Sequence, residues 1–202
     1  MHAVDRQQWD DRYASTDLVW TAAPNVFVVR ELAGLHPGQA LDLGAGEGRN
    51  AIWLAEHGWQ VTAVDFSGVA LAKAAQLAAG RGVTGITWDA ADLRGYQPPP
   101  GSFDLVLLAY IHLPPAESDA LLHAAATALA PGGTLLVIGH DRDNIAHGYG
   151  GPQEPTVLYQ AAEVVAALPG LIIVQAGQER RPVPADDGER TAIDTLVRAQ
   201  RP

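Results

Sequence analysis

The chain has 202 residues, of which 48% are hydrophobic and 18% are charged, a composition typical of one globular domain rather than of a disordered chain. Its formal net charge of −10 and its lack of Lys/Arg runs argue against nucleic-acid and anionic-membrane partners, and the absence of cysteine excludes disulfides and thiolate chemistry. No apolar run has the length of a membrane span and the N-terminus has no signal-peptide pattern, so we expect a cytoplasmic protein.

From residue 40 onward, predicted strands alternate with predicted helices, which indicates a mainly parallel sheet with helices on both faces. The preceding segment, residues 4–35, should form helical pieces around a loop. The predicted strands are Ala40–Leu43, Val61–Val64, Ile86–Asp89, Phe103–Ala109, Thr134–Gly139, Leu171–Gln178 and Ala192–Ala199. The predicted helices are Asn50–Glu56, Ser67–Ala79, Ala116–Ala130 and Ala161–Leu168.

The last two predicted strands are separated only by a short polar connection, Arg180 to Arg190, which favours an antiparallel pair at one edge of the sheet. Pro131-Gly132-Gly133 should end the helix before the fifth strand. The expected fold class is α/β: a doubly wound, seven-stranded, mainly parallel sheet with an antiparallel C-terminal edge strand. We expect it to form a single domain over residues 1–202, with residues 1–35 as a helical flap segment.

The most informative stretch is Leu41-Asp42-Leu43-Gly44-Ala45-Gly46-Glu47-Gly48-Arg49-Asn50, in which a strand runs into a glycine-rich turn and a helix. Gly44 and Gly46 allow a sharp turn and the close approach of a ligand. The following helix points its free N–H groups at the same place, where they can hold an anionic or polar ligand group. This pattern predicts a nucleotide-type cofactor site.

Asp65 ends the next predicted strand, about 20 residues past the glycines, where a carboxylate suits a pair of ribose hydroxyls. Two cofactors use this arrangement, a dinucleotide and S-adenosylmethionine. Arg49 occupies the position where the dinucleotide fingerprint has Gly or Ala, and Asp42 would repel a pyrophosphate. The cationic amino group and sulfonium of S-adenosylmethionine suit a carboxylate at Asp42, so this charge argument favours that cofactor.

The segment from Leu41 to Asn50, with Val61 to Asp65 behind it, resembles the cofactor motif of Rossmann-like (class I) S-adenosylmethionine-dependent methyltransferases. The form Gly-Glu-Gly-Arg-Asn is similar to small-molecule members near the tellurite-resistance and thiopurine-type enzymes. The resemblance implies that Asp92 accepts from the adenine amino group, with Asp89 as its rival, and that Leu93 donates its backbone N–H to the ring. The cofactor contacts that it implies, together with those from the motif itself, are Asp42, Gly44, Ala45, Gly46, Arg49, Asn50, Asp65, Phe66, Ala91, Asp92, Leu93, Ala109, Tyr110 and Trp20.

Three polar residues follow the fourth and fifth predicted strands and are candidates for catalysis. His112 lies where an acceptor would sit, and a histidine is the usual proton acceptor near neutral pH. Its alternative role is a loop histidine bonded to the backbone. His140 and Asp141 are placed similarly, with a solvated loop as their alternative. A metal site formed by these three is weakly supported because no metal-binding spacing is present, and no metal is expected. The glycine-rich segment 148–152 could act as a lid.

The N-terminal segment contains Trp9, Tyr13 and Trp20 with little apolar filler between them. They could pack on the sheet as ordinary core residues, or form a flap in which Trp20 faces the sulfonium through a cation–π contact. We predict methyl transfer by in-line displacement to a small-molecule acceptor, a soft nucleophile or a compact natural product, by a monomer or homodimer. The alternatives are a non-catalytic S-adenosylmethionine-binding module and a nicotinamide-dependent dehydrogenase.

Overall fold

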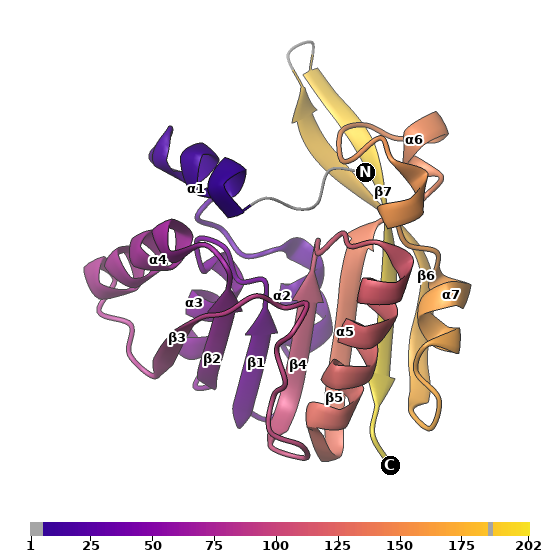
Figure 1. Cartoon of the computed structure of the whole chain (residues 1–202), viewed down its shortest axis with the longest axis horizontal. Coiled ribbons are helices and arrows are strands. Elements are labelled where there is room, and N and C mark those ends of the chain that lie inside the picture. Colours follow the sequence, from indigo (N-terminus) through magenta and orange to yellow (C-terminus); the bar gives the residue numbers. More distant parts are fainter. Residues whose placement is uncertain (1–5, 186–187) are drawn as a thin grey trace.

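The computed structural model describes residues 6–185 and 188–202 and has a seven-stranded sheet in the order β3-β2-β1-β4-β5-β7-β6 (Figure 1). Strands β1 to β5 are parallel, and β7 runs antiparallel to both of its neighbours, β5 and β6. This confirms the predicted fold class, with β6 as the outer strand of the antiparallel pair. The strands are β1 (Gln39–Leu43), β2 (Gln60–Asp65), β3 (Ile86–Ala90), β4 (Phe103–Ala109), β5 (Leu129–His140), β6 (Ile172–Ala185) and β7 (Gly188–Gln200).

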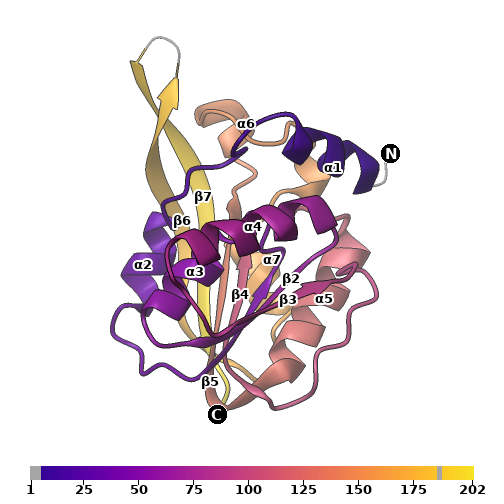
Figure 2. The same ribbon diagram turned by 90° about the vertical axis from the view of Figure 1, so that its left-hand side faces the viewer.

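Helices cover both faces of the sheet, because alternate strand residues are apolar on either side (Figure 2). Leu41 and Leu43 of β1 pack toward α5 and α7, whereas Ala40 packs toward α2 and α3. Ser67 caps α4 by accepting from the Ala70 N–H at 3.1 Å. The helices are α1 (Arg6–Ala14), α2 (Val26–Leu32), α3 (Arg49–Glu56), α4 (Gly68–Gly80), α5 (Pro115–Ala128), α6 (Asn144–His147) and α7 (Ala161–Ala166), with a 3₁₀ turn at Pro155–Val157. Within the described residues, no helix is both long and apolar enough to cross a membrane.

The sequence prediction was wrong about the segment from Arg180 to Arg190. Its described residues are not a connection but continue β6 to Ala185 and start β7 at Gly188, while residues 186 and 187 lie outside the described part. The two strands pair with each other in register from Arg180↔Ile193 to Ala185↔Gly188, so their hairpin projects beyond the sheet (Figure 1). The polar composition of this segment was wrongly interpreted as a loop, because two strands that pair only with each other and project into solvent need no apolar face.

The end of α5 also differs from the prediction. The helix stops at Ala128 rather than Ala130, because Leu129 takes an extended backbone (φ −64°, ψ 136°) and pairs with Phe103 of β4. The strand assignment of β5 therefore includes Pro131-Gly132-Gly133, which had been predicted as a turn.

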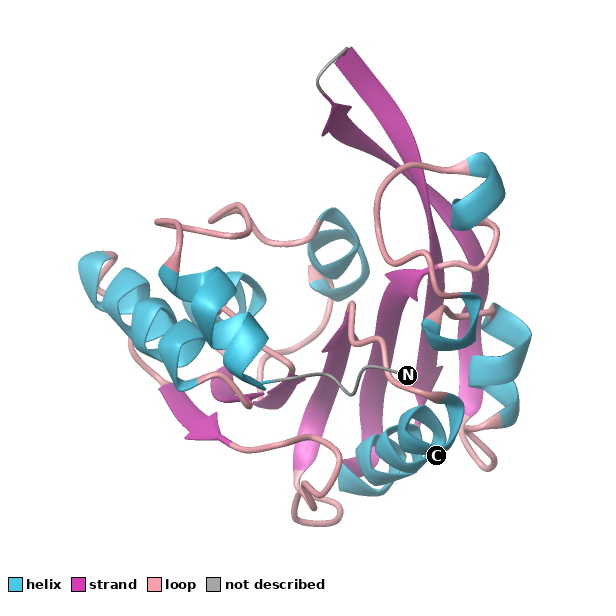
Figure 3. Cartoon of the chain, turned by 45° about the horizontal axis from the view of Figure 1, so that its top comes forward, coloured by secondary structure: helices cyan, strands magenta, loops and turns pink. Residues whose placement is uncertain are grey.

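The carboxyl ends of β1, β2, β4 and β5 meet at one edge of the sheet. Viewed toward that edge, α1 and the chain that follows it lie beside α4, on the opposite side from α6 and the projecting β6–β7 hairpin (Figure 3). Residues of the predicted N-terminal segment before Arg6 lie outside the described part. This edge is where ligands gather in doubly wound sheets, so the fold brings the predicted site residues to one side of the molecule.

Candidate functional site

The turn between β1 and α3 contains three glycines in the left-handed region: Gly44 (φ 77°), Gly46 (φ 54°) and Gly48 (φ 76°). A Cβ on Gly44 would lie 1.9 Å from the Ile111 side chain. A Cβ on Gly48 would lie 2.8 Å from both the Ala74 Cβ and the Trp88 ring. Side chains are therefore excluded from the turn both by conformation and by packing. Gly48 is part of the Gly-Glu-Gly-Arg-Asn form but was not among the cofactor contacts predicted from the sequence.

Two buried carboxylates flank this turn, as predicted. Asp65 accepts through Oδ2 from the Gly46 N–H at 2.8 Å and through Oδ1 from the Ser67 N–H at 2.9 Å. Burial raises the pKa of Asp65, although these N–H groups oppose the shift. Asp65 thereby ties the end of β2 to the glycine-rich turn.

Asp42 is 1% exposed, and its Oδ2 has no hydrogen-bond partner among the described residues. Burial, and then the nearby Asp65, raise the pKa of Asp42 to about 7, while Arg49 opposes this. A buried carboxylate oxygen without a partner is costly, and a cationic ligand group would satisfy it. This oxygen therefore fits the amino group of S-adenosylmethionine better than a pyrophosphate.

The first two residues of α3 face different neighbours. Arg49 is largely buried, which lowers its pKa, and its charge interacts with Tyr110, Arg181 and Asp42. Asn50 is buried, and its Oδ1 accepts from the Asn25 N–H at 3.0 Å. Asn50 thus holds the start of α2, a structural contact that the sequence did not indicate.

The end of β3 lies next to the same turn. Ala91 donates its N–H to the Asp65 carbonyl at 3.1 Å, and Leu93 Cδ1 lies 3.6 Å from the position of a Cβ on Gly44. Asp92 is half-exposed and ion-paired with Arg94, whose guanidinium lowers the pKa of Asp92. A ligand that used the Asp92 carboxylate would therefore share it with Arg94. Of the remaining predicted contacts, Ala45, Phe66 and Ala109 are partly buried and lie at the carboxyl ends of β1, β2 and β4.

Tyr110 follows β4 with φ 61°, the one positive φ among the described non-glycine residues. Its hydroxyl donates to Asp194 Oδ2 at 2.9 Å and accepts from Asn25 Nδ2 at 3.2 Å. Arg181 Nε donates to the same Asp194 oxygen at 2.8 Å, and its guanidinium carbon lies 5.4 Å from the Tyr110 ring centre. Burial raises the pKa of Tyr110, as does the neighbouring Asp194 charge. Strained residues of this kind are concentrated at functional sites.

Asp194 is a site residue that the sequence analysis missed. It is 0% exposed and belongs to the run Ala192–Val197 of β7, in which every residue is buried. Burial acts to raise its pKa, but contacts from His140, Arg181 and Tyr110 outweigh burial and hold the pKa below its ordinary value. A lone acidic residue within an apolar strand was the available signal, because such a charge needs partners.

His112 and His140 come together, but with different surroundings. Their rings stack with centres 5.4 Å apart, and His112 Nε2 accepts from the His140 backbone N–H at 3.2 Å. Burial, followed by the neighbouring His140, lowers the pKa of His112 to about 3. The geometry therefore favours the backbone-bonded alternative for His112 over a proton acceptor. His140 Nδ1 instead lies 3.1 Å from Asp194 Oδ1.

Asp141, predicted as a catalytic candidate, has a structural role in the described fold. Asp141 is 2% exposed and accepts through Oδ1 from the Asp143 N–H and from Gln178 Nε2, both at 2.9 Å. Its Oδ2 accepts from Thr195 Oγ1 at 2.6 Å. These bonds fasten the chain after β5 to β6 and β7. The sequence position was compatible with catalysis, but the inward orientation could not be deduced from it.

Glu47, which the sequence analysis also left out, fastens the N-terminal segment to the glycine-rich turn. It is 4% exposed, and its Oε2 accepts from the backbone N–H groups of Val19 at 2.9 Å and Trp20 at 3.1 Å. Lys73 Nζ lies 3.5 Å from Glu47 Oε1 and also donates to the carbonyls of Tyr13 and Thr16. The segment is therefore pinned beside the candidate cofactor site.

The N-terminal aromatic residues differ in burial and in their neighbours. Tyr13 is buried, and its hydroxyl lies 3.0 Å from the position of a Cβ on Gly46. Trp20 is 41% exposed and packs near Trp9, with the Arg12 guanidinium carbon 5.2 Å from its ring centre. Arg12 therefore already makes the cation–π contact that had been predicted for a cofactor sulfonium.

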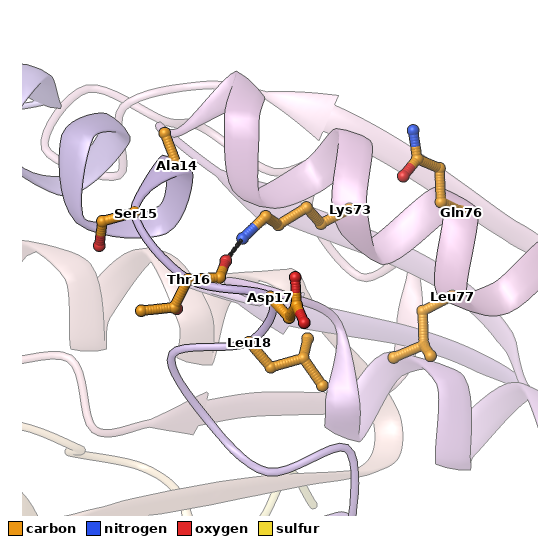
Figure 4. A pocket seen from close by; sticks show the side chains of 8 residues that line it. All are labelled: Ala14, Ser15, Thr16, Asp17, Leu18, Lys73, Gln76 and Leu77. Atoms are coloured by element: carbon orange, nitrogen blue, oxygen red, sulfur yellow. Dashed lines mark hydrogen bonds between the residues drawn. The ribbon is translucent and has the colours of Figure 1, made fainter.

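A hollow of about 750 Å³ lies between the end of α1 and α4, with the Lys73 side chain reaching across it to Thr16 (Figure 4). Neither aspartate that flanks the glycine-rich turn lines this hollow. We therefore place the candidate site at the glycine-rich turn and not in this depression. Its lining residues are Ala14, Ser15, Thr16, Asp17, Leu18, Lys73, Gln76 and Leu77.

Comparison with known proteins agrees with this geometry. Residues 40–133, which run from β1 to the turn inside β5, match the family described as "Methyltransferase domain". This match covers just under half of the chain. A curated relative, 2-heptyl-1-hydroxyquinolin-4(1H)-one methyltransferase of Mycobacteroides abscessus, is 30% identical over 131 residues, which cover 64% of this chain and 57% of that protein. The match thus spans little more than half of the relative's length.

Solved structures extend the likeness in fold to nearly the whole chain. The N-methyltransferase NodS of Bradyrhizobium japonicum WM9, in complex with S-adenosyl-L-homocysteine, gives a TM-score of 0.74 at 20% identity and covers 98% of both chains. TehB of Haemophilus influenzae gives a TM-score of 0.73 at 16% identity, covering 98% of this chain and 67% of that chain. At these identities the likeness concerns the fold alone.

Proposed function

We propose that this methyltransferase-domain protein binds S-adenosylmethionine at the edge formed by β1, β2 and β3 and transfers its methyl group to a small-molecule acceptor. The observation that carries the proposal is the unpartnered, buried carboxylate oxygen of Asp42 beside a glycine turn that excludes side chains. That arrangement suits a cationic ligand group and disfavours a pyrophosphate.

In this proposal the chain's own residues bind and orient the ligand. Asp42 accepts a hydrogen bond from the amino group. Asp65 gives up its bond to the Gly46 N–H and accepts hydrogen bonds from the ribose hydroxyls. Arg49 contributes a positive charge for the carboxylate, which is attached to the same carbon as that amino group. Asp92 and Leu93 flank the base, and Tyr110 flanks the reacting end. The bound cofactor supplies an activated methyl group on a sulfonium with an excellent leaving group.

Catalysis then depends mainly on alignment and on the exclusion of water, because no covalent intermediate is needed. The strained Tyr110, fixed by Asp194 and Asn25, gives a rigid wall next to the reacting end. The pinned segment around Trp20 shields the glycine-rich turn from one side. We also propose that residues 1–202 act as one domain with residues 1–35 as a flap segment, in a cytoplasmic monomer or homodimer.

A small acceptor is supported by two observations. The net charge of −10 disfavours a nucleic acid, and a relative is named for methylation of a hydroxyquinolone. A screen with methyl-labelled S-adenosylmethionine against phenols, N-hydroxy heterocycles, thiols, chalcogen anions, halides and amines tests the proposal. Product with at least one acceptor supports it.

The two alternative functions predict different results in the same assay. A non-catalytic module would bind S-adenosylmethionine and S-adenosylhomocysteine but turn over none of the acceptors. A dehydrogenase would bind a nicotinamide dinucleotide instead, which fluorescence titration with the reduced cofactor would reveal.

A further inference from the structure

A second buried polar cluster lies where β4 and β5 end and the β6–β7 hairpin begins to project. At its centre is Asp194, whose Oδ2 receives the Tyr110 hydroxyl and Arg181 Nε. Its other oxygen, Oδ1, lies 3.1 Å from His140 Nδ1. These two buried atoms have no other hydrogen-bond partner among the described residues, so each is the available partner of the other.

The His140 ring is held in place from several sides. It stacks on His112 at 5.4 Å between centres and lies 5.0 Å from the Tyr110 ring centre. A Cβ on Gly151 would come within 2.7 Å of His140 Cδ2, so the loop after α6 covers one face of the ring. The side chain still keeps 14% exposure, so it is not fully enclosed by these neighbours.

A carboxylate at Nδ1 determines what the opposite nitrogen can do. With the Nδ1 proton directed at Asp194 Oδ1, the neutral ring carries its lone pair on Nε2, and a proton gained there is stabilised by the carboxylate. His112 cannot replace this group, because its Nε2 is occupied by the His140 N–H.

We infer that His140 and Asp194 form a proton-accepting dyad for the methyl acceptor, with His140 as the base and Asp194 as its positioning residue. The inference rests on the proposed function and narrows its substrate class. The acceptor is a small molecule with a hydroxyl, phenol or N-hydroxy group that is protonated near neutral pH. Of the two acceptor types predicted from the sequence, this inference favours the compact natural product over the soft nucleophile.

The step balances without any further reactant. The acceptor oxygen forms a bond to the methyl carbon, the carbon–sulfur bond breaks with its electron pair going to sulfur, and the acceptor proton passes to His140 Nε2. The proton leaves to solvent after product release. Asp194 stays ionised throughout, held by Arg181 and the Tyr110 hydroxyl.

The charged and titratable groups around the dyad come from three parts of the fold. Arg181 approaches from β6, Tyr110 and His112 from the chain after β4, and Arg49 interacts with Tyr110 and Arg181 from α3. Asp194→Asn removes the carboxylate charge beside the His140 ring, so the pH–rate profile of that variant reports whether this charge supports the base.

The test uses para-methylphenol, un-ionised near pH 8, and para-nitrophenol, mostly ionised there, as matched acceptors. His140→Gln should slow transfer to para-methylphenol by about 10²–10⁴-fold and transfer to para-nitrophenol by less than about threefold. Asp194→Asn should slow para-methylphenol transfer by about 10–100-fold and move the pH–rate profile to lower pH. His123→Gln, an exposed histidine on α5, is the control and should change neither rate.

Equal losses with both phenols, or turnover only of acceptors ionised in solution, would overturn the dyad while leaving methyl transfer intact. ¹⁵N NMR of the His140 ring in the wild-type protein provides a second measurement, which requires neither an acceptor nor a substituted protein. The neutral ring should be protonated on Nδ1, and protonation on Nε2 would overturn the inference. Failure to bind S-adenosylhomocysteine would instead contradict the proposed function itself.

Discussion

Asp42→Asn is the substitution whose effect the structure defines most closely. Burial, and then the nearby Asp65 charge, raises the pKa of Asp42 from its ordinary value of 3.8 to about 7. The carboxylate is 1% exposed, and one of its oxygens has no hydrogen-bond partner among the described residues. A raised pKa in the folded state means that the unfolded chain loses this proton first as the pH rises. Stability is therefore lost between about pH 4 and pH 7, by at most about 4 kcal/mol at 1.36 kcal/mol per unit.

The asparagine variant has no charge to bury, so its free energy of unfolding should lack this loss. Chemical denaturation of both proteins at a series of pH values gives the difference directly. The difference should change by about 2–4 kcal/mol in favour of the variant from pH 4 to pH 7 and then level off. Comparing pH trends removes the constant cost of burying the amide.

Asp119→Asn, an exposed position on α5, is the matched control and should follow the wild-type trend. If the proposed site is correct, Asp42→Asn should also bind S-adenosylmethionine about 10- to 100-fold more weakly, because it loses a hydrogen bond between charged groups. Parallel pH trends for wild type and Asp42→Asn would refute the assignment of a strained, ligand-ready carboxylate.

Three further predictions concern the rest of the site. Asp65→Ala should weaken S-adenosylmethionine binding by about 1.5–3 kcal/mol, and unchanged affinity in calorimetry would remove Asp65 from the site. Deleting residues up to Ala23 should leave a cooperative melt but weaker cofactor binding, since the segment is fastened through Glu47; loss of the melt would make it core instead. Gly48→Ala should lower the free energy of unfolding by about 1–3 kcal/mol, because a Cβ there meets the Trp88 ring and the φ of 76° is strained; a wild-type denaturation midpoint would contradict this.

The regular parts of the fold were predictable because local patterns determine them. β4 was predicted at Phe103–Ala109 and observed there, since a continuous apolar run in a parallel sheet has sharp ends. The turn from β1 into α3 was predictable from its glycines. The long β6–β7 hairpin was not, because its outer residues pair only with each other and have no buried face to pattern.

The site divides in the same way. Asp42 and Asp65 were predictable because motif spacing places them at strand ends. The surroundings of Asp141 and Asp194 depend on how β5 and β7 pair, which brings His140 opposite Asp194 in the sheet register. An acidic residue in an apolar strand indicates that Asp194 needs partners, but the sequence does not identify partners that lie about 50 or more positions away.

Titration calorimetry with S-adenosylhomocysteine tests the central claim most directly. The account predicts one binding event per chain for the wild type, weakened by at least tenfold in both Asp42→Asn and Asp65→Ala and unchanged in Asp119→Asn. No heat of binding in the wild type, or equal affinity in all four proteins, would contradict it.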